Sequence, residues 1–331
     1  MFETILAAVA DPLAPVQVAA TKAAEMSWLT GARLVLYHAA YDAVLSGRPF
    51  FDSDHLARAR QEHLQRHSRA LDGLAHSLAG DGPPPTTIAE WHRTPHEAIV
   101  RAAMREHADM VVAEPRFRAT RRRLLSFSHT DWELVRLCPV PLLLARGPAP
   151  YRSPMILAAV DPVRDTEKLS TLDLRIVQVA HELERMTDGT LRLLHCAIEP
   201  RATPGMPFSV IELERRQSRQ LLKLLLKEAG LPSRALRVRT GKPAEAIAEA
   251  VVDDSVDVLV LGSMTRGRLE NLVLGSTAEK LLHTAACDML VVKPLGFHTS
   301  VAAPARAPRE MVRGPAEKPE APVRARRRRK G

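Results

Sequence analysis

A glycine-bearing loop after an apolar segment carries the residues best suited to bind a ligand. The continuous apolar run Val258–Leu261 ends at Gly262, and a stretch rich in short polar and basic residues then leads to Gly275. Such a run is typical of a strand that is buried on both faces of a parallel sheet. A glycine loop at the carboxyl end of a strand, followed by a helix, is a common phosphate-binding place in α/β sheets. The pattern predicts a phosphate cradle of backbone N–H groups.

The segment after Gly275 has the signature of a helix N-terminus. Ser276 stands three residues before Glu279, and this spacing predicts a capping box with Ser276 as the N-cap. The N–H groups of the first turn would complete the cradle, because a helix N-terminus favours an anion. A ligand is not required by these residues, since Ser276 is explained as a cap and Gly275 as the residue that lets the turn close.

Other site motifs fail on residue type or spacing. The stretch 262–267 lacks the Lys and Ser/Thr of a Walker P-loop, and no GxGxxG follows a predicted strand. His92 and His96 are four residues apart, but Pro95 between them prevents a helix from aligning them on a metal ion. No nucleophile, base and orienting residue can be assembled. We therefore expect no metal site, no catalytic residues and no committed enzyme.

Alternating apolar strands and amphipathic helices must position the loop. Strands that alternate with helices predict parallel βαβ units and an α/β fold. In the first half we expect strands at 5–9, 34–37, 86–91, 110–112 and 142–145, with helices at 15–29, 52–78, 95–106 and 131–137.

The same order of segments begins again after a linker at 148–154. MILAAV at 155–160 repeats ILAAV at 5–9, and Asp257-Val-Leu-Val repeats Asp109-Met-Val-Val. Matched positions stay about 150 residues apart along the whole chain, which indicates a duplicated domain. His38 and His195 end equivalent predicted strands, and we interpret both as structural. The division expected is a first domain at 1–147, a linker at 148–154, a second domain at 155–296 and a tail at 297–331.

The positive charge is concentrated in the tail. The formal net charge is +9, of which residues 297–331 supply +7, so that the remainder is nearly neutral. Because the tail is rich in Ala, Pro and Arg and poor in large apolar residues, we expect it to be disordered. Its end, RARRRRK at 324–330, suits nucleic acid, an anionic surface or an acidic partner, and equally a solvated run that aids solubility.

Cysteine usage and hydropathy indicate a cytoplasmic protein. Cys138, Cys196 and Cys287 have no paired spacing and lie in or beside apolar runs, which is typical of buried thiols in a reducing compartment. The N-terminal stretch has an early Glu3 and no basic region, unlike a signal peptide. Apolar runs are too short for a transmembrane segment.

Several segments resemble the universal stress protein family. They are DVLVLGSM at 257–264, LVLGSTAEKLLHTAACDMLVVKP at 272–294, the MILAAVD start at 155–161 and TGKPAEAI at 240–247. Because the resemblance covers both repeats, the chain is similar to the tandem two-domain type of this family. It implies two doubly wound domains of the adenine nucleotide alpha hydrolase-like class, each a five-stranded parallel sheet with helices on both faces.

The resemblance also implies how the domains associate. The last strands of the two repeats, 142–145 and 289–292, would pair inside one chain and form a pseudo-dimer. Further dimerisation to a homodimer would be possible through the same architecture. The implied function is a stress-response protein that acts as a ligand-sensing or regulatory module.

Nucleotide-binding members of the family share the pattern Gly, two residues, Gly, nine residues, then Gly followed by Ser or Thr. Gly262, Gly275 and Ser276 match the first, third and following positions, whereas Thr265 replaces the second glycine. A glycine there lets the backbone approach a phosphate closely or adopt a positive φ, so Thr265 weakens the match.

The remaining site residues are implied by the resemblance. Asp161 would accept hydrogen bonds from the adenine or ribose, with the base near Cys196 and Leu261, and Thr277 would join Ser276 at the phosphates. The implied ligand is ATP with Mg²⁺, with slow hydrolysis at most. The candidate binding set is Asp161, Cys196, Leu261, Gly262, Thr265, Gly275, Ser276 and Thr277.

The first repeat lacks this set. Glu114, Ser128 and His129 stand at the equivalents of the three matched positions, and Ala10 at that of the aspartate. A carboxylate where phosphate should bind is repulsive, so we expect no ATP binding of the family type there. The arginine-rich loop 116–123 suits another anion, a partner or plain solvent exposure.

Three functions therefore remain open. The second domain binds an adenine nucleotide; or neither domain does and the protein is an interaction scaffold, as Thr265 and the degenerate first repeat favour. The third is association of the basic tail with nucleic acid or an anionic membrane, which would weaken steeply with salt.

Overall fold

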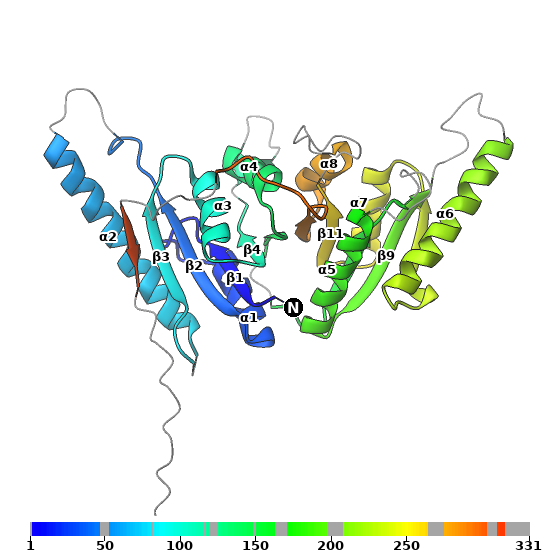
Figure 1. The fold of residues 1–331 in the computed structure, drawn as a ribbon, viewed down its shortest axis with the longest axis horizontal. Coiled ribbons are helices and arrows are strands. Elements are labelled where there is room, and N and C mark those ends of the chain that lie inside the picture. The colour runs from blue at the N-terminus through cyan, green and yellow to red at the C-terminus, as the bar shows by residue number, and fades with distance from the viewer. Residues whose placement is uncertain are drawn as a thin grey trace, which may run out of the picture.

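The computed structural model is a layered α/β/α molecule in which one long sheet runs through both repeats (Figure 1). Helices cover the sheet on both faces. The structure describes residues 2–46, 53–80, 82–115, 117–119, 125–147, 150–162, 171–197, 208–263, 275–302 and 310–314.

The first half contains five strands of the main sheet, four helices and a small hairpin. Gly31 adopts φ 70° directly after the first helix, and Pro95 occupies the start of the third, as helix termini favour. The elements are β1 (Thr4–Ala8), α1 (Val18–Thr30), β2 (Arg33–Ala40), α2 (Ser53–Leu78), β3 (Thr86–Trp91), α3 (Pro95–Arg105), β4 (Met110–Ala113), the hairpin β5 (Phe117–Ala119) and β6 (Leu125–Phe127), α4 (His129–Leu137) and β7 (Leu142–Leu144).

The second half repeats this order without the hairpin in its described residues. Its loop between the fourth strand and the last helix, 264–274, lies outside the described residues. The elements are β8 (Met155–Ala159), α5 (Thr171–Thr187), β9 (Thr190–Ala197), α6 (Phe208–Glu228), a 3-10 turn at Ser233–Ala235, β10 (Leu236–Thr240), α7 (Pro243–Asp253), β11 (Val258–Gly262), α8 (Ser276–Thr284) and β12 (Asp288–Val292).

The strand order confirms the predicted fold class. The sheet runs β10-β9-β8-β11-β12-β7-β4-β1-β2-β3-β13, where β13 is the short strand Met311–Arg313, and within each half all five strands are parallel. The halves meet where β7 and β12 pair antiparallel, with Leu143 opposite Leu290. The expected pairing of the last strands is therefore present inside one chain.

Two hydrophobic cores continue across the junction, one on each face of the sheet. α1, α2, α5 and α6 pack on one face, and α3, α4, α7 and α8 pack on the other (Figure 1). Among the described residues no helix is both long and apolar enough to cross a membrane.

A buried ion pair connects α1 of the first half with β12 of the second half. The Lys22 ammonium on α1 lies 3.0 Å from the Asp288 carboxylate at the start of β12, and both side chains are buried. The Tyr151 hydroxyl donates to Asp288 at 2.6 Å, and the Arg146 backbone N–H donates to it at 2.6 Å. A buried charge is tolerated when it is paired and hydrogen-bonded in this way.

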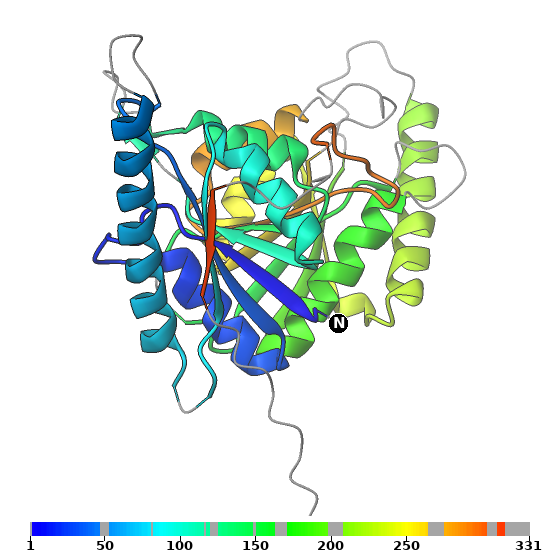
Figure 2. The same cartoon turned by 60° about the vertical axis from the view of Figure 1, so that its left-hand side comes forward.

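The prediction that the whole tail is disordered is wrong at residues 310–314. Strand β13 (Met311–Arg313) pairs antiparallel with β3 and forms the outer edge of the sheet, beside α2 (Figure 2). Composition could not reveal this, because the segment is held by an edge that exists only in the folded first half. The basic run 324–330 lies outside the described residues.

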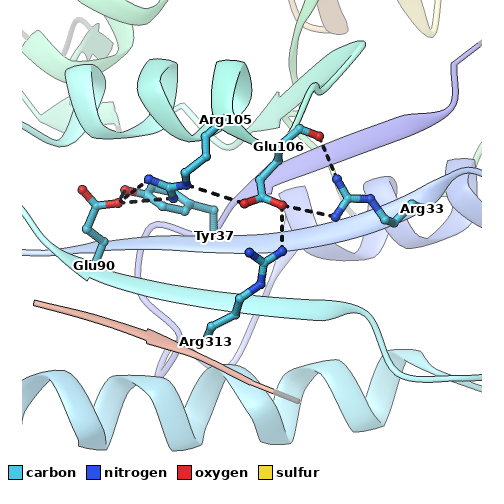
Figure 3. Close-up of polar contacts among 6 residues, drawn as sticks. All are labelled: Arg33, Tyr37, Glu90, Arg105, Glu106 and Arg313. Atoms are coloured by element: carbon cyan, nitrogen blue, oxygen red, sulfur yellow. Dashed lines mark hydrogen bonds and ion pairs between the residues drawn. The ribbon is translucent and has the colours of Figure 1, made fainter. Parts of the chain in front are cut away.

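A cluster of charged side chains anchors β13. Arg313 lies 2.9 Å from the carboxylate of Glu106, which is only 5% exposed and also accepts a hydrogen bond from Arg33 at 3.2 Å (Figure 3). Arg105 lies between Glu106 and a second buried carboxylate, Glu90 (Figure 3). Arg313 therefore adds a cation to a carboxylate that is removed from water and would be costly to bury without partners.

Candidate ligand-binding site

A cavity of about 400 Å³ opens at the carboxyl ends of β8, β9 and β11 in the second half. The chain leaves β8 toward β9 on one side and reaches β11 on the other, so this is the point where the strand order reverses. Such a switch point leaves a crevice between the loops that cross in opposite directions, and α/β folds bind ligands there. Residues of helices α5, α7 and α8 form the other walls.

Seven of the eight candidate residues line this cavity. Thr265, the eighth, lies in 264–274, outside the described residues. Residues far apart in sequence are thus brought to one place by the parallel strands, whose carboxyl ends share an edge. The seven are Asp161, Cys196, Leu261, Gly262, Gly275, Ser276 and Thr277.

Asp161 is the carboxylate at the mouth of the cavity. Its side chain is 44% exposed, and its Oδ1 lies 4.0 Å from Nδ1 of the buried His195. His195 Nδ1 also lies 3.3 Å from the Val160 carbonyl, and His38 makes the equivalent contact with Val9 at 2.9 Å. Because the same contact recurs in both halves, the two histidines share a structural role, as expected.

Asp173 on α5 is a wall residue that the sequence analysis missed. It is fully buried, and its Oδ1 accepts the backbone N–H of Asp161 at 3.0 Å. This bond fixes the backbone at Asp161. A signal existed in the sequence, because Asp173 is the one acidic residue on a helix face otherwise formed by Leu172, Ile176 and Val177.

The predicted capping box at Ser276 is wrong. Gly275 is the N-cap of α8, with extended φ −67° and ψ 138°, and Ser276 is the first helical residue, with an exposed side chain. The Gly275 carbonyl accepts the N–H of Glu279 at 2.9 Å, so the helix starts one residue earlier than the spacing suggested. Gly275 has no side chain to occupy the N–H groups of the first turn, which have no acceptor within the helix.

Gly262 has a packing role that the sequence analysis did not anticipate. A Cβ at this position would lie 2.7 Å from Cδ2 of Leu172, so the glycine allows α5 to approach the end of β11. The expected role of Gly262 was to help form the phosphate cradle of backbone N–H groups, and its φ is not positive. The glycine is required by the fold whether or not a ligand binds beside it.

Cys196 is a wall residue without nucleophilic character. Burial, with a smaller effect from the Asp161 charge, raises the pKa of Cys196 to about 11. The side chain therefore remains a protonated thiol at neutral pH, and a thiol is a poor nucleophile compared with a thiolate. Its place beside Asp161 suits contact with an apolar or polarisable ligand surface.

The equivalent place in the first half is nearly closed. Its cavity measures about 40 Å³ and is lined by Ala10 and Glu114 among others. The α4 N-terminus there is capped by its own side chains, because Ser128 Oγ accepts the Asp131 N–H at 3.3 Å and Asp131 accepts the Ser128 N–H at 3.0 Å. A carboxylate of the protein occupies the helix N-terminus, where an anionic ligand would bind.

Metal ligands are not grouped in the described part of the chain. No three His, Cys, Asp or Glu side chains among those residues are arranged to hold an ion.

Both repeats match one known protein family. The sequence profile of the universal stress protein family matches twice, at residues 1–146 and 155–293. The chain belongs to the universal stress protein family. Both repeats are universal stress domains, as the tandem prediction required.

Curated relatives align along most of the chain and most of their own length. The chain is 24% identical to universal stress protein E of Escherichia coli K12 over 311 residues, which cover 91% of this chain and 97% of the relative. It is 24% identical to the universal stress protein E homolog of Haemophilus influenzae over 265 residues, or 77% of this chain and 84% of that protein.

Solved structures share the fold. A universal stress protein of Pseudomonas aeruginosa UCBPP-PA14 superposes with TM-score 0.69 at 22% identity, covering 88% of this chain and 94% of that one. A universal stress protein of Archaeoglobus fulgidus superposes with TM-score 0.59 at 15% identity, covering 88% and 98%. At these identities the comparison establishes the architecture.

Proposed function

We propose that the second half binds an adenine nucleotide, ATP with Mg²⁺, in the cavity beside Asp161, and that the protein is a ligand-sensing or regulatory module. One observation carries this proposal. The α8 N-terminus, capped only by Gly275, opens on a cavity of about 400 Å³ whose wall holds the described residues of the family nucleotide pattern.

The cavity offers the two surfaces that a nucleotide needs. Apolar side chains, among them Leu194, Ile247 and Leu261, suit a base, and the exposed Asp161 carboxylate suits amino or hydroxyl donors. The N–H groups at Ser276 and Thr277 and the positive end of the α8 dipole suit phosphates. Mg²⁺ would be held chiefly by the phosphates and water, as is common for this ion.

The wall supports binding rather than catalysis. Asp173, the fully buried carboxylate, accepts the Asp161 N–H, and the Cys196 thiol stays protonated. Neither group suits a general base for an attacking water, so hydrolysis would be slow. All three cysteines are unpaired, which supports a reducing compartment and a cytoplasmic role.

Calorimetry with ATP and Mg²⁺ tests the proposal directly. We expect one site per chain, and we expect Asp161→Asn to weaken binding by about tenfold or more because a charge-assisted hydrogen bond is lost. Asp11→Asn in the first half is the matched control and should bind as the wild type does. Absence of heat and of any thermal shift with ATP would contradict the proposal.

Ligand series separate recognition of the base from recognition of the phosphates. AMP, GTP and inorganic triphosphate should each bind more weakly than ATP if both surfaces are used. Mass spectrometry of small molecules that copurify with the protein should find an adenine nucleotide. If inorganic triphosphate binds as tightly as ATP, the site recognises only the phosphates and not the base.

The basic end at 324–330 is a second candidate for partner binding. Its support is the strand β13, which holds residues 311–313 against β3 and so fixes where the following segment starts. An acidic partner or nucleic acid would then bind beside the first half. Truncation after Gly296 should abolish salt-sensitive binding to such a polyanion, whereas retained binding would assign it elsewhere.

A further inference from the structure

A cationic side chain just beyond each central strand, β7 and β12, contacts the opposite half. Arg146 follows β7 closely, and its guanidinium donates to the Leu282 carbonyl in the last turn of α8. Lys293 follows β12, and its ammonium donates to the Val135 carbonyl in the last turn of α4 at 2.6 Å. The two cations are as far apart in sequence as the two carbonyls, so these contacts are equivalent in the duplicated fold.

The equivalent contacts place a cation at the negative end of a helix in the other half. Burial lowers the pKa of Arg146 and of Lys293, the latter to about 8, with a smaller opposing effect of Cys138 on Lys293. Lys293 is only 7% exposed. A cation is retained at this desolvated position by the oxygens around it, since without them its burial would be costly.

Lys293 has an additional contact in its own half. Its ammonium donates to Ser263 Oγ at 2.6 Å, and Ser263 directly follows Gly262 at the end of β11. In the first half Pro115 stands where Ser263 stands in the second, so that position offers Arg146 no hydroxyl. The two halves therefore differ in what the crossing cation can hold.

Ser263 connects the end of β11, which carries Gly262, with the N-terminus of α8, which carries Gly275. Its carbonyl accepts the N–H of Gly275, the N-cap of α8, at 3.1 Å. Its own N–H donates to the Val292 carbonyl at 3.3 Å, and the residue is 1% exposed. The distance between Gly262 and Gly275 is thus set through Ser263, and the Ser263 side chain is held by Lys293.

We propose that Lys293 is a positioning residue of the nucleotide site, which fixes Ser263 and couples the Gly262–Gly275 geometry to helix α4 of the first half. This inference rests on the proposed nucleotide binding. The first half, whose own cavity is nearly closed, supplies the Val135 carbonyl that holds Lys293 where it contacts Ser263 of the second half. Both halves then contribute to a single site.

The side chain of lysine suits this role. Its ammonium carries three donors, of which two serve Val135 and Ser263, while the Phe297 ring lies 4.9 Å away. Methionine of similar length would fill the space without donors. The Ser263 Oγ would then lose its donor, and the position of the Ser263 carbonyl, which accepts the Gly275 N–H, would be less firmly fixed.

Three variants test the inference by calorimetry with ATP and Mg²⁺. Lys293→Met and Ser263→Ala should each weaken binding by about tenfold, the size of one lost hydrogen bond to a charged group. Arg146→Met is the matched control, because it removes the equivalent crossing contact without touching Ser263, and its affinity should stay within about twofold of the wild type. Ser263→Thr keeps the hydroxyl and should bind as the wild type does.

Hydrogen exchange without nucleotide tests the same geometry independently. The amides of Gly275 to Ala278 should exchange faster in Lys293→Met and Ser263→Ala, and at the wild-type rate in Arg146→Met. Ser263→Ala keeps the Lys293–Val135 bond, so it carries the test if Lys293→Met fails to fold.

The outcomes separate the inference from the proposed function. If the wild type binds no nucleotide, the proposed function fails, and exchange at Gly275 alone decides whether Lys293 positions Ser263 and Gly275. Equal effects of Lys293→Met and Arg146→Met, in affinity or in exchange, would overturn the inference and assign both residues to the junction. Unchanged exchange in Lys293→Met would overturn it as well.

Discussion

The two halves of this chain share one topology and differ at the N-terminus of one helix. In the first half, Ser128 and Asp131 cap α4 and satisfy its first turn from within the protein. In the second half, Gly275 caps α8 and brings no side chain. The adjoining cavities measure about 40 Å³ and about 400 Å³.

The difference shows that the fold alone does not make a binding site. Both halves place a helix N-terminus at the switch point of the sheet, where an anion is favoured. A carboxylate of the chain already holds that place in the first half. The same helix dipole therefore stabilises the protein in one half and is available to a ligand in the other.

The buried ion pair at the junction of the two halves should give the largest effect on stability. Lys22→Met should lower the free energy of unfolding by about 3 kcal/mol, because the buried Asp288 carboxylate would lose its cation. Lys242→Met is the control, since Lys242 pairs with Glu245 in an exposed contact and should change little. Urea unfolding measures both. Equal small losses would show that Tyr151 and Arg146 suffice to hold Asp288.

Transfer of the first-half cap to the second half should abolish the difference. Gly275→Ser with Ala278→Asp recreates the Ser128 and Asp131 pair at the equivalent positions. We expect ATP affinity to fall by about 100-fold or more, because a carboxylate would compete with phosphate for the first turn. Calorimetry gives the affinity, and thermal unfolding confirms that the double variant folds. Unchanged affinity would show that α8 does not hold the phosphates.

The reverse change should cost stability without creating a site. Ser128→Gly with Asp131→Ala removes both arms of the α4 capping box and should lower the free energy of unfolding by about 1 to 2 kcal/mol. ATP should still bind once per chain, since Ala10 and Glu114 remain in the first half. A second bound ATP in calorimetry would show that the cap alone closes the first site.

The pH dependence of stability should report Lys293, the smallest of these effects. Its pKa is lowered to about 8 from 10.5, so between these values the unfolded chain binds more protons and stability rises with pH. We expect a gain of roughly 1 kcal/mol between about pH 7 and 9. Urea unfolding across this range should show the rise in the wild type and its loss in Lys293→Met.

Above about pH 9 the cysteines oppose this rise. Burial raises the pKa of Cys138, Cys196 and Cys287 to about 11, so the folded chain binds more protons there and stability falls with pH. A wild-type profile as flat as that of Lys293→Met below pH 9 would contradict the buried cation.

Local sequence patterns were enough for the architecture. The apolar runs at 5–9 and 258–261, the alternation of strands with helices and the spacing of repeats each depend on neighbouring residues. The order of matched segments then implied two copies of one sheet. The pairing of β7 with β12 followed from the resemblance, and the structure confirms it.

The candidate site was predictable only in part. Asp161, Gly262 and Gly275 could be located from the family pattern, and all three line the cavity. Asp173 could not be assigned, because its partner is a backbone N–H in a different segment. The cap at Gly275 was misplaced by one residue, since capping depends on backbone angles that the spacing of Ser276 and Glu279 does not determine.

By itself, the sequence determined the duplicated α/β fold, the strands and helices of each copy and the half that retains the glycine frame. The strands and helices follow from local periodicity, the duplication from matched segments about 150 residues apart, and the glycine frame from the resemblance to the family pattern. Tertiary structure alone decided that β13 docks on β3, that Asp131 caps α4 in the first half, and that Lys293 contacts both Ser263 in its own half and Val135 across the junction. Each of these last results depends on a burial, an edge or an acceptor that exists only once distant segments have packed.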